Sequence, residues 1–214
     1  IDAGTVTVSG ASTYAAVAEL LRPQGLALHN LASLPHISVA GAIATATHGA
    51  GVANGNLASA VSAVTVVDAA GELRRFDRSH ADFNGAVVSL GALGPVVDVT
   101  VDLVPTFDIA QTVYEDLPLD LACDHLAEIL ASAYSTSIFT TFQDAELLGN
   151  VWLKRRVDTS ADAGAVGDEL FGASPARVAH HPVPGLEATG CTEQLGQPGL
   201  WSDRLPHFKM GFSP

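Results

Sequence analysis

The chain has 214 residues, of which 48% are hydrophobic and 15% are charged, and its formal net charge is −13. A chain this apolar can bury enough surface to offset its ordering entropy, which excludes an intrinsically disordered protein. With 10 Lys and Arg against 23 Asp and Glu, its surface repels phosphate backbones and anionic lipids, so nucleic acids and membrane surfaces are poor candidates as partners. No apolar run approaches the ~18–20 residues of a membrane-spanning helix. These features predict a soluble globular protein.

The first elements are predicted by hydrophobic spacing and by turn residues. A strand is expected over residues 5–8, followed by a helix from Thr13 to Arg22 that Ser12 caps. Apolar residues recur along that helix at intervals of three and four, which makes one buried stripe: Tyr14, Val17, Ala18 and Leu21. Pro23 and Gly25 end the helix, and a short strand follows at residues 26–28.

A β-hairpin and a strongly alternating strand come next. Residues 64–67 and 73–76 flank a turn-rich segment, which is typical of a hairpin. A short helix is expected over residues 82–90, with Phe83, Val87 and Leu90 on one side. Valines then alternate with polar residues over 97–103, so Asp98 and Asp102 share a face. We interpret that face as solvated rather than as an acid/base pair.

Pro105 marks the expected domain boundary, which divides the chain into residues 1–105 and 106–214. Beyond it we expect a strand at 109–116, a helix at 120–134, strands at 137–142 and 151–156, and loops from Ala161 onward. Strands mixed with helices and hairpins favour the α+β class. Trp152 and Trp201 are expected to be packing residues.

The cysteines and histidines give little sign of a disulfide framework or a metal site. Two cysteines, Cys123 and Cys191, fit neither a disulfide scaffold nor a thiolate cluster. We therefore expect free, inert thiols in a reducing compartment, the cytoplasm. His180 and His181 point apart in an extended chain and have no acidic residue nearby, so no metal is expected, and a metal-dependent hydrolase has only the histidine count behind it.

Residues 31–51 form the segment with the clearest chemical character. Three glycines allow a ligand close to the backbone (Gly41, Gly49, Gly51), and hydroxyl groups supply donors (Ser33, Ser38, Thr45, Thr47). A helix turn that begins near Ser38 leaves N–H groups for a phosphate. The segment contains neither a GxGxxG nor a GK[ST] motif. The alternative interpretation is a helix whose small residues pack closely against a sheet.

Several stretches resemble one enzyme family. LPHISVAGAIATATHGAG, NGNLASAV and SLGALGPVVDVTVDL, together with VTVSGASTYAAVAELLRPQGLAL, resemble the second half of the FAD-binding domain of vanillyl-alcohol-oxidase-like (PCMH-type) FAD-linked oxidoreductases. The resemblance is closer to the alditol (xylitol) oxidases, which are related to the aldonolactone oxidases. VWLKRR, HPVPG and CTEQLGQPGLWSDRLPHF resemble the start of their substrate domain.

The resemblance implies a function and a set of contact residues. The implied protein is an FAD-dependent oxidase that passes a hydride from a polyol or a sugar lactone to the flavin, with O₂ reoxidation giving H₂O₂. The implied FAD contacts, with Ser33 also touching substrate, are Ser33, Ser38, Gly41, Thr45, Ala46, Thr47, His48 and Val96. Relatives often have Gly at the position of Ala46. The histidine that tethers flavin covalently and the residues that handle the substrate alcohol are not in this stretch, so no catalytic residue is assigned.

The ends of the sequence predict a piece of a longer protein. The only methionine is Met210, so Ile1 is not an initiator. A half-site of this kind is expected to hold FAD weakly and to self-associate through its exposed apolar surface. The alternative function is a non-catalytic flavin-fold module with a scaffolding or regulatory role.

Overall fold

The computed structural model describes residues 1–2, 4–157 and 167–211. It confirms the α+β class and divides the chain into two compact units. The first comprises Ile1–Gly49 and Gly55–Thr106, and the second comprises Ala50–Asn54 and the described residues between Phe107 and Gly211. The division after Thr106 lies beside Pro105, whereas the membership of Ala50–Asn54 in the second unit was not expected.

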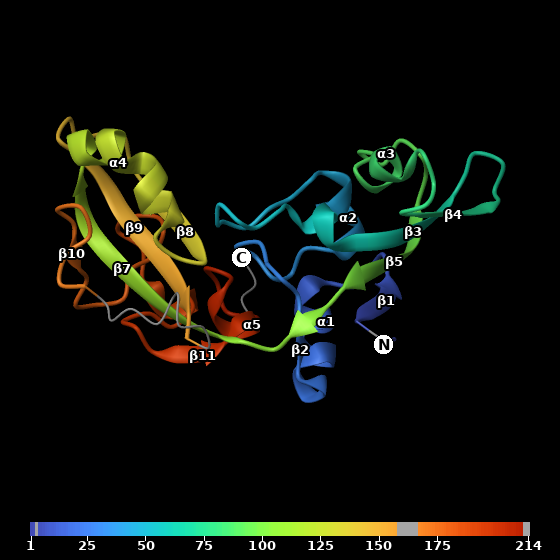
Figure 1. Ribbon diagram of the computed structural model, residues 1–214, viewed down its shortest axis with the longest axis horizontal. Coiled ribbons are helices and arrows are strands. Elements are labelled where there is room, and N and C mark those ends of the chain that lie inside the picture. The colour runs from blue at the N-terminus through green and yellow to red at the C-terminus, as the bar shows by residue number, and fades with distance from the viewer. Residues whose placement is uncertain (3, 158–166, 212–214) are drawn as a thin grey trace. The chain divides into compact units, whose positions relative to one another are not determined.

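The first unit is built on a four-stranded antiparallel sheet in the order β1-β5-β3-β4 (Figure 1). The strands are β1 (Thr5–Ser9), β3 (Val61–Val67), β4 (Leu73–Asp77) and β5 (Val96–Asp102). Val99 pairs with Val8 on one side and Val64 on the other, and both Val64 and Val99 are fully buried. The predicted hairpin is confirmed, because β3 and β4 pair from Val67↔Leu73 to Ala63↔Asp77.

Helices and short strands complete this unit. They are α1 (Tyr14–Leu21), the 3₁₀ helix η1 (Arg22–Gln24), β2 (Leu26–Ala27), α2 (Val39–Ala44), the 3₁₀ helix η2 (Leu57–Ala60), α3 (Phe83–Val87) and β6 (Val104–Pro105), which pairs with β2. The predicted apolar stripe of α1 is confirmed as buried.

Two local predictions in the first unit were wrong. The hydroxyl that caps α1 is that of Thr13, which accepts from the Ala16 N–H at 3.2 Å, so the cap lies one residue after Ser12. Helix α3 ends at Val87, and Leu90 is 77% exposed instead of facing the core. Leu90 leaves the helical stripe because its backbone has a φ of +52° and its N–H donates to Ala44 O.

The second unit contains a sheet in the order β10-β7-β9-β8, with β11 also paired to β7. Its elements are β7 (Asp108–Pro118), α4 (Leu119–Ala131), β8 (Ser135–Phe139), β9 (Leu147–Arg156), β10 (Ser174–Pro175), the 3₁₀ helix η3 (Ala188–Gly190), β11 (Pro198–Leu200) and α5 (Trp201–Arg204). Figure 1 shows α4 lying along one face of this sheet, where Ile129 and Leu153 share a core cluster. The loops expected from Ala161 onward include β10, β11 and α5; residues 158–166 lie outside the described residues.

The opposite face of this sheet buries a lysine. Lys154 is 1% exposed, and its Nζ donates to Leu205 O at the end of α5. Burial lowers the pKa of Lys154 to about 7. Trp152 and Trp201 are each 1% exposed, which confirms their expected packing role.

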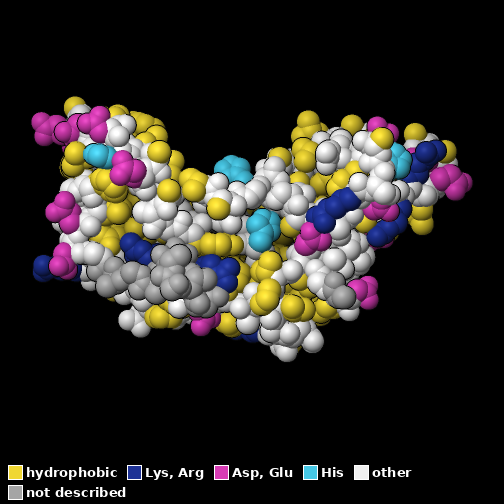
Figure 2. Space-filling model, in the orientation of Figure 1, with side chains coloured by type: hydrophobic (Ala, Val, Ile, Leu, Met, Phe, Trp, Pro, Cys, Tyr) yellow, Lys and Arg dark blue, Asp and Glu magenta, His cyan; other side chains and the backbone are white. Residues whose placement is uncertain are grey.

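The surface chemistry agrees with the charge pattern of the sequence. Figure 2 shows acidic side chains on both units, and Lys and Arg side chains on both as well. On β5, Asp98 lies 3.8 Å from Arg75 and Asp102 lies 2.6 Å from Arg78, so these carboxylates form surface ion pairs. Cys123 is exposed and Cys191 buried, and both are free thiols. Among the described residues, no helix has the length and apolarity to cross a bilayer.

Candidate functional site

A concave site of about 560 Å³ lies in the first unit, formed by the segment around α2. A volume of this size is ordinary for a small-molecule site. The site brings together six of the eight predicted contact residues. Its lining contains no Asp, Glu, Lys or Arg and consists of Ala32, Ser33, Leu34, Ile37, Ser38, Gly41, Ala42, Thr45, Thr47 and His48. In a chain with a net charge of −13, a lining free of carboxylates suits a ligand that carries phosphates.

The start of α2 does not offer its N–H groups to a ligand, which corrects the expectation of a phosphate site there. The Val39 and Ala40 N–H groups donate to Ser12 O at 2.8 Å and Gly10 O at 3.0 Å. The Gly41 N–H donates to the Ser38 hydroxyl oxygen at 3.2 Å. All three donors therefore have protein partners. Ser38 caps the helix because its hydroxyl oxygen accepts from the Gly41 N–H, and its own hydroxyl proton remains to bond a ligand.

Hydroxyl groups at the end of α2 form a connected pair. Thr45 Oγ1 donates to Gly41 O at 3.0 Å and lies 3.0 Å from Thr47 Oγ1. With the Thr45 proton directed to the carbonyl, the Thr47 hydroxyl is the donor of this pair. Both hydroxyl oxygens belong to residues that line the concavity, and each retains capacity to accept a bond from an N–H or O–H group of a ligand.

His48 completes the lining, and its tautomer follows from its neighbour. Its Nδ1 lies 2.7 Å from Gly49 O. A carbonyl oxygen can only accept, so Nδ1 carries the proton and Nε2 of the neutral ring is an acceptor. The side chain is exposed on the wall of the site.

The glycines of this segment have different roles. A Cβ on Gly41 would meet only the Ser38 hydroxyl, at 2.8 Å, so this glycine leaves open the wall that a ligand approaches. A Cβ on Gly49 would lie 2.3 Å from Leu31 O, and one on Gly51 would lie 2.2 Å from Tyr134 O. Gly49 and Gly51 therefore serve close packing within the protein, whereas the sequence predicted ligand approach at all three.

Ala46 and Val96 are the two predicted contacts outside the lining. Ala46 has a φ of +52°, in the left-handed region that glycine adopts readily, which agrees with its position in a tight turn after α2. Val96 begins β5 and lies beside Gly10, where an added Cβ would be 3.1 Å from Val96 Cγ1 and 3.2 Å from Ala40 Cβ. Four residues that the sequence did not single out line the site instead, namely Ala32, Leu34, Ile37 and Ala42.

The residues present fit a flavin dinucleotide. Small and apolar side chains offer area for a planar ring system, and Gly41 leaves a wall open. The Ser38 hydroxyl can donate to a phosphate oxygen, and the Thr45 and Thr47 oxygens can accept from ribityl hydroxyl groups. The donor set contains no cluster suited to a metal, and among the described residues no group of three or more His, Cys, Asp or Glu could hold one. His180 does have an acidic neighbour, contrary to expectation, since its Nε2 lies 2.9 Å from Glu115 Oε1.

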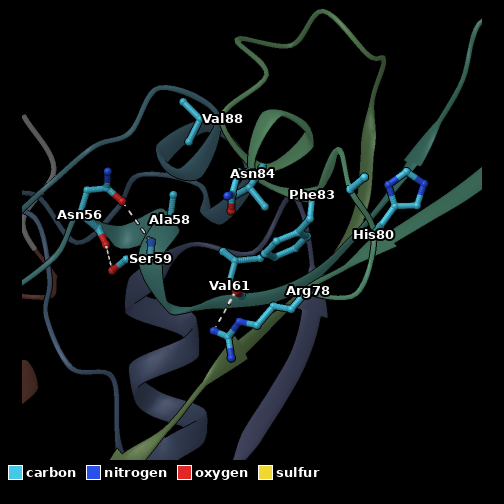
Figure 3. A pocket seen from close by; sticks show the side chains of 11 residues that line it. Asn56, Ala58, Ser59, Val61, Arg78, His80, Phe83, Asn84 and Val88 are labelled. Carbon is cyan, nitrogen blue, oxygen red and sulfur yellow. Dashed lines mark hydrogen bonds between the residues drawn. The ribbon is translucent and has the colours of Figure 1, made fainter.

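A second concavity of about 500 Å³ in the same unit lies between η2 and α3 (Figure 3). Arg78 extends along its floor and donates to Val61 O at 3.0 Å and to Asp102 Oδ2 at 2.6 Å. The Asp102 carboxylate already pairs with the Arg78 guanidinium, so this arginine offers little net positive charge for binding an anion. This concavity is therefore a weaker candidate than the site around α2.

Comparison with known proteins identifies the cofactor. Residues 1–77 match a family described as an FAD binding domain. The alditol oxidase of a Streptomyces species is 47% identical over 212 residues, which is 99% of this chain and 49% of that protein. The D-arabinono-1,4-lactone oxidase of Candida glabrata is 36% identical over 109 residues, or 50% of this chain and 21% of that protein.

A solved structure supports the fold. A cholesterol oxidase from Brevibacterium sterolicum aligns with a TM-score of 0.61 and 22% identity, over 70% of this chain and 32% of that one. The chain spans about half the length of the alditol oxidase it matches, and a smaller share of the other two proteins. The FAD-domain match, the 47% identity and the shared fold agree with the neutral, hydroxyl-lined site. Residues 1–77 match the FAD-binding-domain family, the chain as a whole is similar to an alditol oxidase, and these matches support FAD as the cofactor.

Proposed function

We propose that these 214 residues are the flavin-binding and substrate-side portion of an oxidase that acts on a polyol or an aldonolactone. The observation that carries the proposal is the 47% identity to an alditol oxidase along 99% of this chain, which includes the whole lining of the site. A polyol is favoured over a lactone, because the match to the lactone oxidase covers only half of the chain.

The proposed roles of Ser38, Gly41, Thr45 and Thr47 draw on their geometry, whereas the substrate contact of Ser33 and the adenine contact of Val96 are what the resemblance implies. Ser33, Ser38, Thr45 and Thr47 bond the flavin dinucleotide with hydroxyl groups, and Gly41 lets it approach the backbone. Ser33 also contacts the substrate, and the backbone of Val96 meets the adenine end. When bound, FAD supplies the hydride-accepting chemistry, with O₂ as the final acceptor and H₂O₂ as the product. His48 offers an Nε2 acceptor toward the site.

The 214 residues alone are expected to hold FAD weakly, because an opposing half of the flavin site would supply further hydrogen bonds to the cofactor. Each neutral hydrogen bond contributes about 0.5–1.5 kcal/mol net, and a tenfold change in affinity corresponds to about 1.4 kcal/mol. Losing the bonds from an opposing half-site would lower affinity by orders of magnitude. The exposed side chains of Leu90 and Leu93 in the loop before β5, 77% and 41% exposed, support the accompanying proposal of self-association.

The test is to express the protein from its complete reading frame and to compare it with residues 1–214 alone. The complete protein is expected to retain FAD through gel filtration and to lose its visible flavin absorbance when xylitol is added without oxygen. Admitting air should restore the absorbance and release peroxide. The 214-residue chain is expected to elute largely colourless.

Other outcomes separate the alternatives. If D-arabinono-1,4-lactone reduces the flavin and xylitol does not, the proposed substrate class becomes the lactones. Flavin that is retained but reduced by neither compound would favour a non-catalytic flavin module, an alternative supported by a site whose only titratable side chain is His48. A complete protein that retains no flavin would refute the oxidase.

A further inference from the structure

The second unit contains a cavity of its own, with a volume of about 350 Å³. Its lining comes from the end of β7, the loop between β8 and β9, β9 itself and the segment after β10, all within that unit. Phe139 and Trp152, whose ring centroids lie 5.4 Å apart, supply aromatic surface. The polar side chains of the lining are Asp116, Thr141, Asp144, Asn150, His180 and His181. This size and this mixed lining are typical of a small-molecule site.

A β-bulge in β7 brings Asp116 to the cavity. β7 changes register against β9 between Tyr114 and Leu117, so Glu115 and Asp116 together oppose one residue of β9. Tyr114 and Leu117 both pack in the core cluster under α4, and in an unbroken strand Asp116 would share the face of Tyr114. The bulge turns Asp116 to the opposite face, where it lines the cavity together with His180.

Asp116 adopts a backbone conformation that an L-residue adopts at a cost. Its φ of +60° lies in the left-handed region, which glycine would occupy without steric penalty. Among the described residues, none donates a hydrogen bond to the Asp116 carboxylate or forms an ion pair with it. A protein contact therefore does not account for an aspartate here. Strain of this kind beside a cavity points to a ligand.

Two further polar groups of the lining are held by their neighbours. The Glu146 and Leu147 N–H groups donate to Asp144 Oδ1 at 2.8 and 2.9 Å and keep the pKa of Asp144 below its ordinary value. The second oxygen of this carboxylate remains an acceptor. The Val183 N–H donates to His181 Nδ1 at 2.9 Å, so Nε2 of the neutral ring carries the proton and is a donor.

The lining thus combines acceptors with donors. The carboxylates of Asp116 and Asp144 accept, the His181 Nε2–H donates, and the Asn150 carboxamide can do both. A phosphate would be repelled by the two carboxylates, and a cation would leave the donors unmatched. Hydroxyl groups donate and accept at once, and the C–H groups between them can pack against the aromatic rings.

We propose that this cavity binds a compound with adjacent hydroxyl groups, either a free polyol or the end of a saccharide, with Asp116 as an acceptor for its hydroxyl protons. The bulge and the left-handed φ serve to place that carboxylate in the cavity. The inference concerns the second unit alone and does not depend on flavin or on the proposed oxidase reaction.

The experiment titrates the flavin-free 214-residue chain with xylitol, with maltose, with 1,5-pentanediol, which lacks adjacent hydroxyl groups, and with calcium chloride. NMR follows the side-chain signals of Asn150 and Trp152, and the indole signal of Trp201, which lies outside the lining, is the internal reference. The variant is Asp116→Gly. Its matched control is Leu195→Gly, because Leu195 also has a φ of +60° but is 47% exposed and does not line the cavity.

Xylitol, maltose or both are expected to shift the Asn150 and Trp152 signals to saturation, while pentanediol and calcium do not. Binding of xylitol alone assigns a free polyol, and binding of maltose alone assigns a saccharide end. Both glycine variants are expected to raise the urea midpoint, because each relieves a left-handed φ. Only Asp116→Gly is expected to weaken binding, by about tenfold, equivalent to about 1.4 kcal/mol.

Four results would overturn the proposal: no saturable shift with either hydroxyl compound, an equal shift with pentanediol, a shift with calcium alone, or unchanged binding in Asp116→Gly. Asp116→Asn, whose side chain also tolerates a left-handed backbone, replaces the glycine variant if that one does not fold. Because no flavin takes part, failure here leaves the test of the proposed oxidase unaffected.

Discussion

Ala46 adopts a left-handed backbone conformation in the turn that carries Thr45 and Thr47, which line the concave site. An L-residue with a side chain loses about 1–2 kcal/mol in this region, and part of that is offset by the greater freedom of glycine in the unfolded chain. With a φ of +52°, Ala46→Gly is expected to stabilise the protein by up to about 1 kcal/mol. Urea unfolding measures the change. Ala70→Gly, an exposed turn alanine without a positive φ, should give no gain, and equal gains at both positions would contradict the strain at Ala46.

Lys154 predicts a pH dependence of stability. Burial lowers its pKa from 10.5 to about 7, so between these values the unfolded chain binds a proton that the folded chain does not. Stability therefore rises with pH across that window, by at most about 1.4 kcal/mol per pH unit, and the penalty is complete below pH 7.

Lys154→Met should flatten this rise, because the replacement has no proton to bind in either state. Thermal unfolding from pH 7 to pH 10 measures the profile for wild type and variant. Lys209→Met removes an exposed lysine that bonds Thr189 O at 2.8 Å, and its profile should follow wild type. A Lys154→Met profile that parallels wild type would show that the lysine stays charged when folded.

At the scale of elements, two adjacent hydroxyl residues, Ser12 and Thr13, precede α1, and the sequence alone does not show which of them caps the helix. Ser12 and Thr13 both precede an apolar stripe, but only Thr13 accepts from the Ala16 N–H. Thr13→Ala is therefore expected to cost about 1 kcal/mol, whereas Ser12→Ala should stay within about 0.5 kcal/mol. Chemical denaturation of both variants tests this, and the reverse order would place the cap at Ser12.

Elements governed by local spacing were predictable, and those governed by distant partners were not. The α1 stripe and the β3–β4 hairpin follow from periodicity and turn residues within a few positions. The donors at the start of α2 bond Gly10 O and Ser12 O, almost thirty residues earlier, so the sequence suggested a free phosphate site where none exists. Six of the predicted contact residues line one concave site because they fall within one continuous segment, 32–48, and their role toward FAD stays a prediction.

The assignment of Ala50–Asn54 to the second unit is the clearest non-local feature. Its determinant is a pair of bonds from Asn54, one of which spans eighty positions to Tyr134 O. Neither glycine spacing nor hydropathy in residues 48–56 contains information about that partner. The same contact explains why Gly51, interpreted from sequence as a ligand-facing glycine, serves packing instead.

At the scale of the whole molecule, the junction between the two units is not an exposed linker. Val104–Pro105 pairs with β2, the Thr106 N–H donates to Gly25 O at 2.9 Å, and Phe107 is 3% exposed. By contrast, Phe142 is 85% exposed in the loop between β8 and β9. Proteases need several residues of accessible, locally unfolded chain, so burial at the junction should protect it.

Limited chymotrypsin digestion is therefore expected to cut first after Phe142 and to leave the junction intact. Residues 158–166 contain no aromatic side chain, so that segment does not compete for an enzyme that prefers aromatic residues. Mass spectrometry should detect residues 1–142 before any product that ends at Phe107, and Phe142→Ser should delay the first cut. Early cleavage at Phe107 would mean that the strand pairing of Val104–Pro105 opens readily.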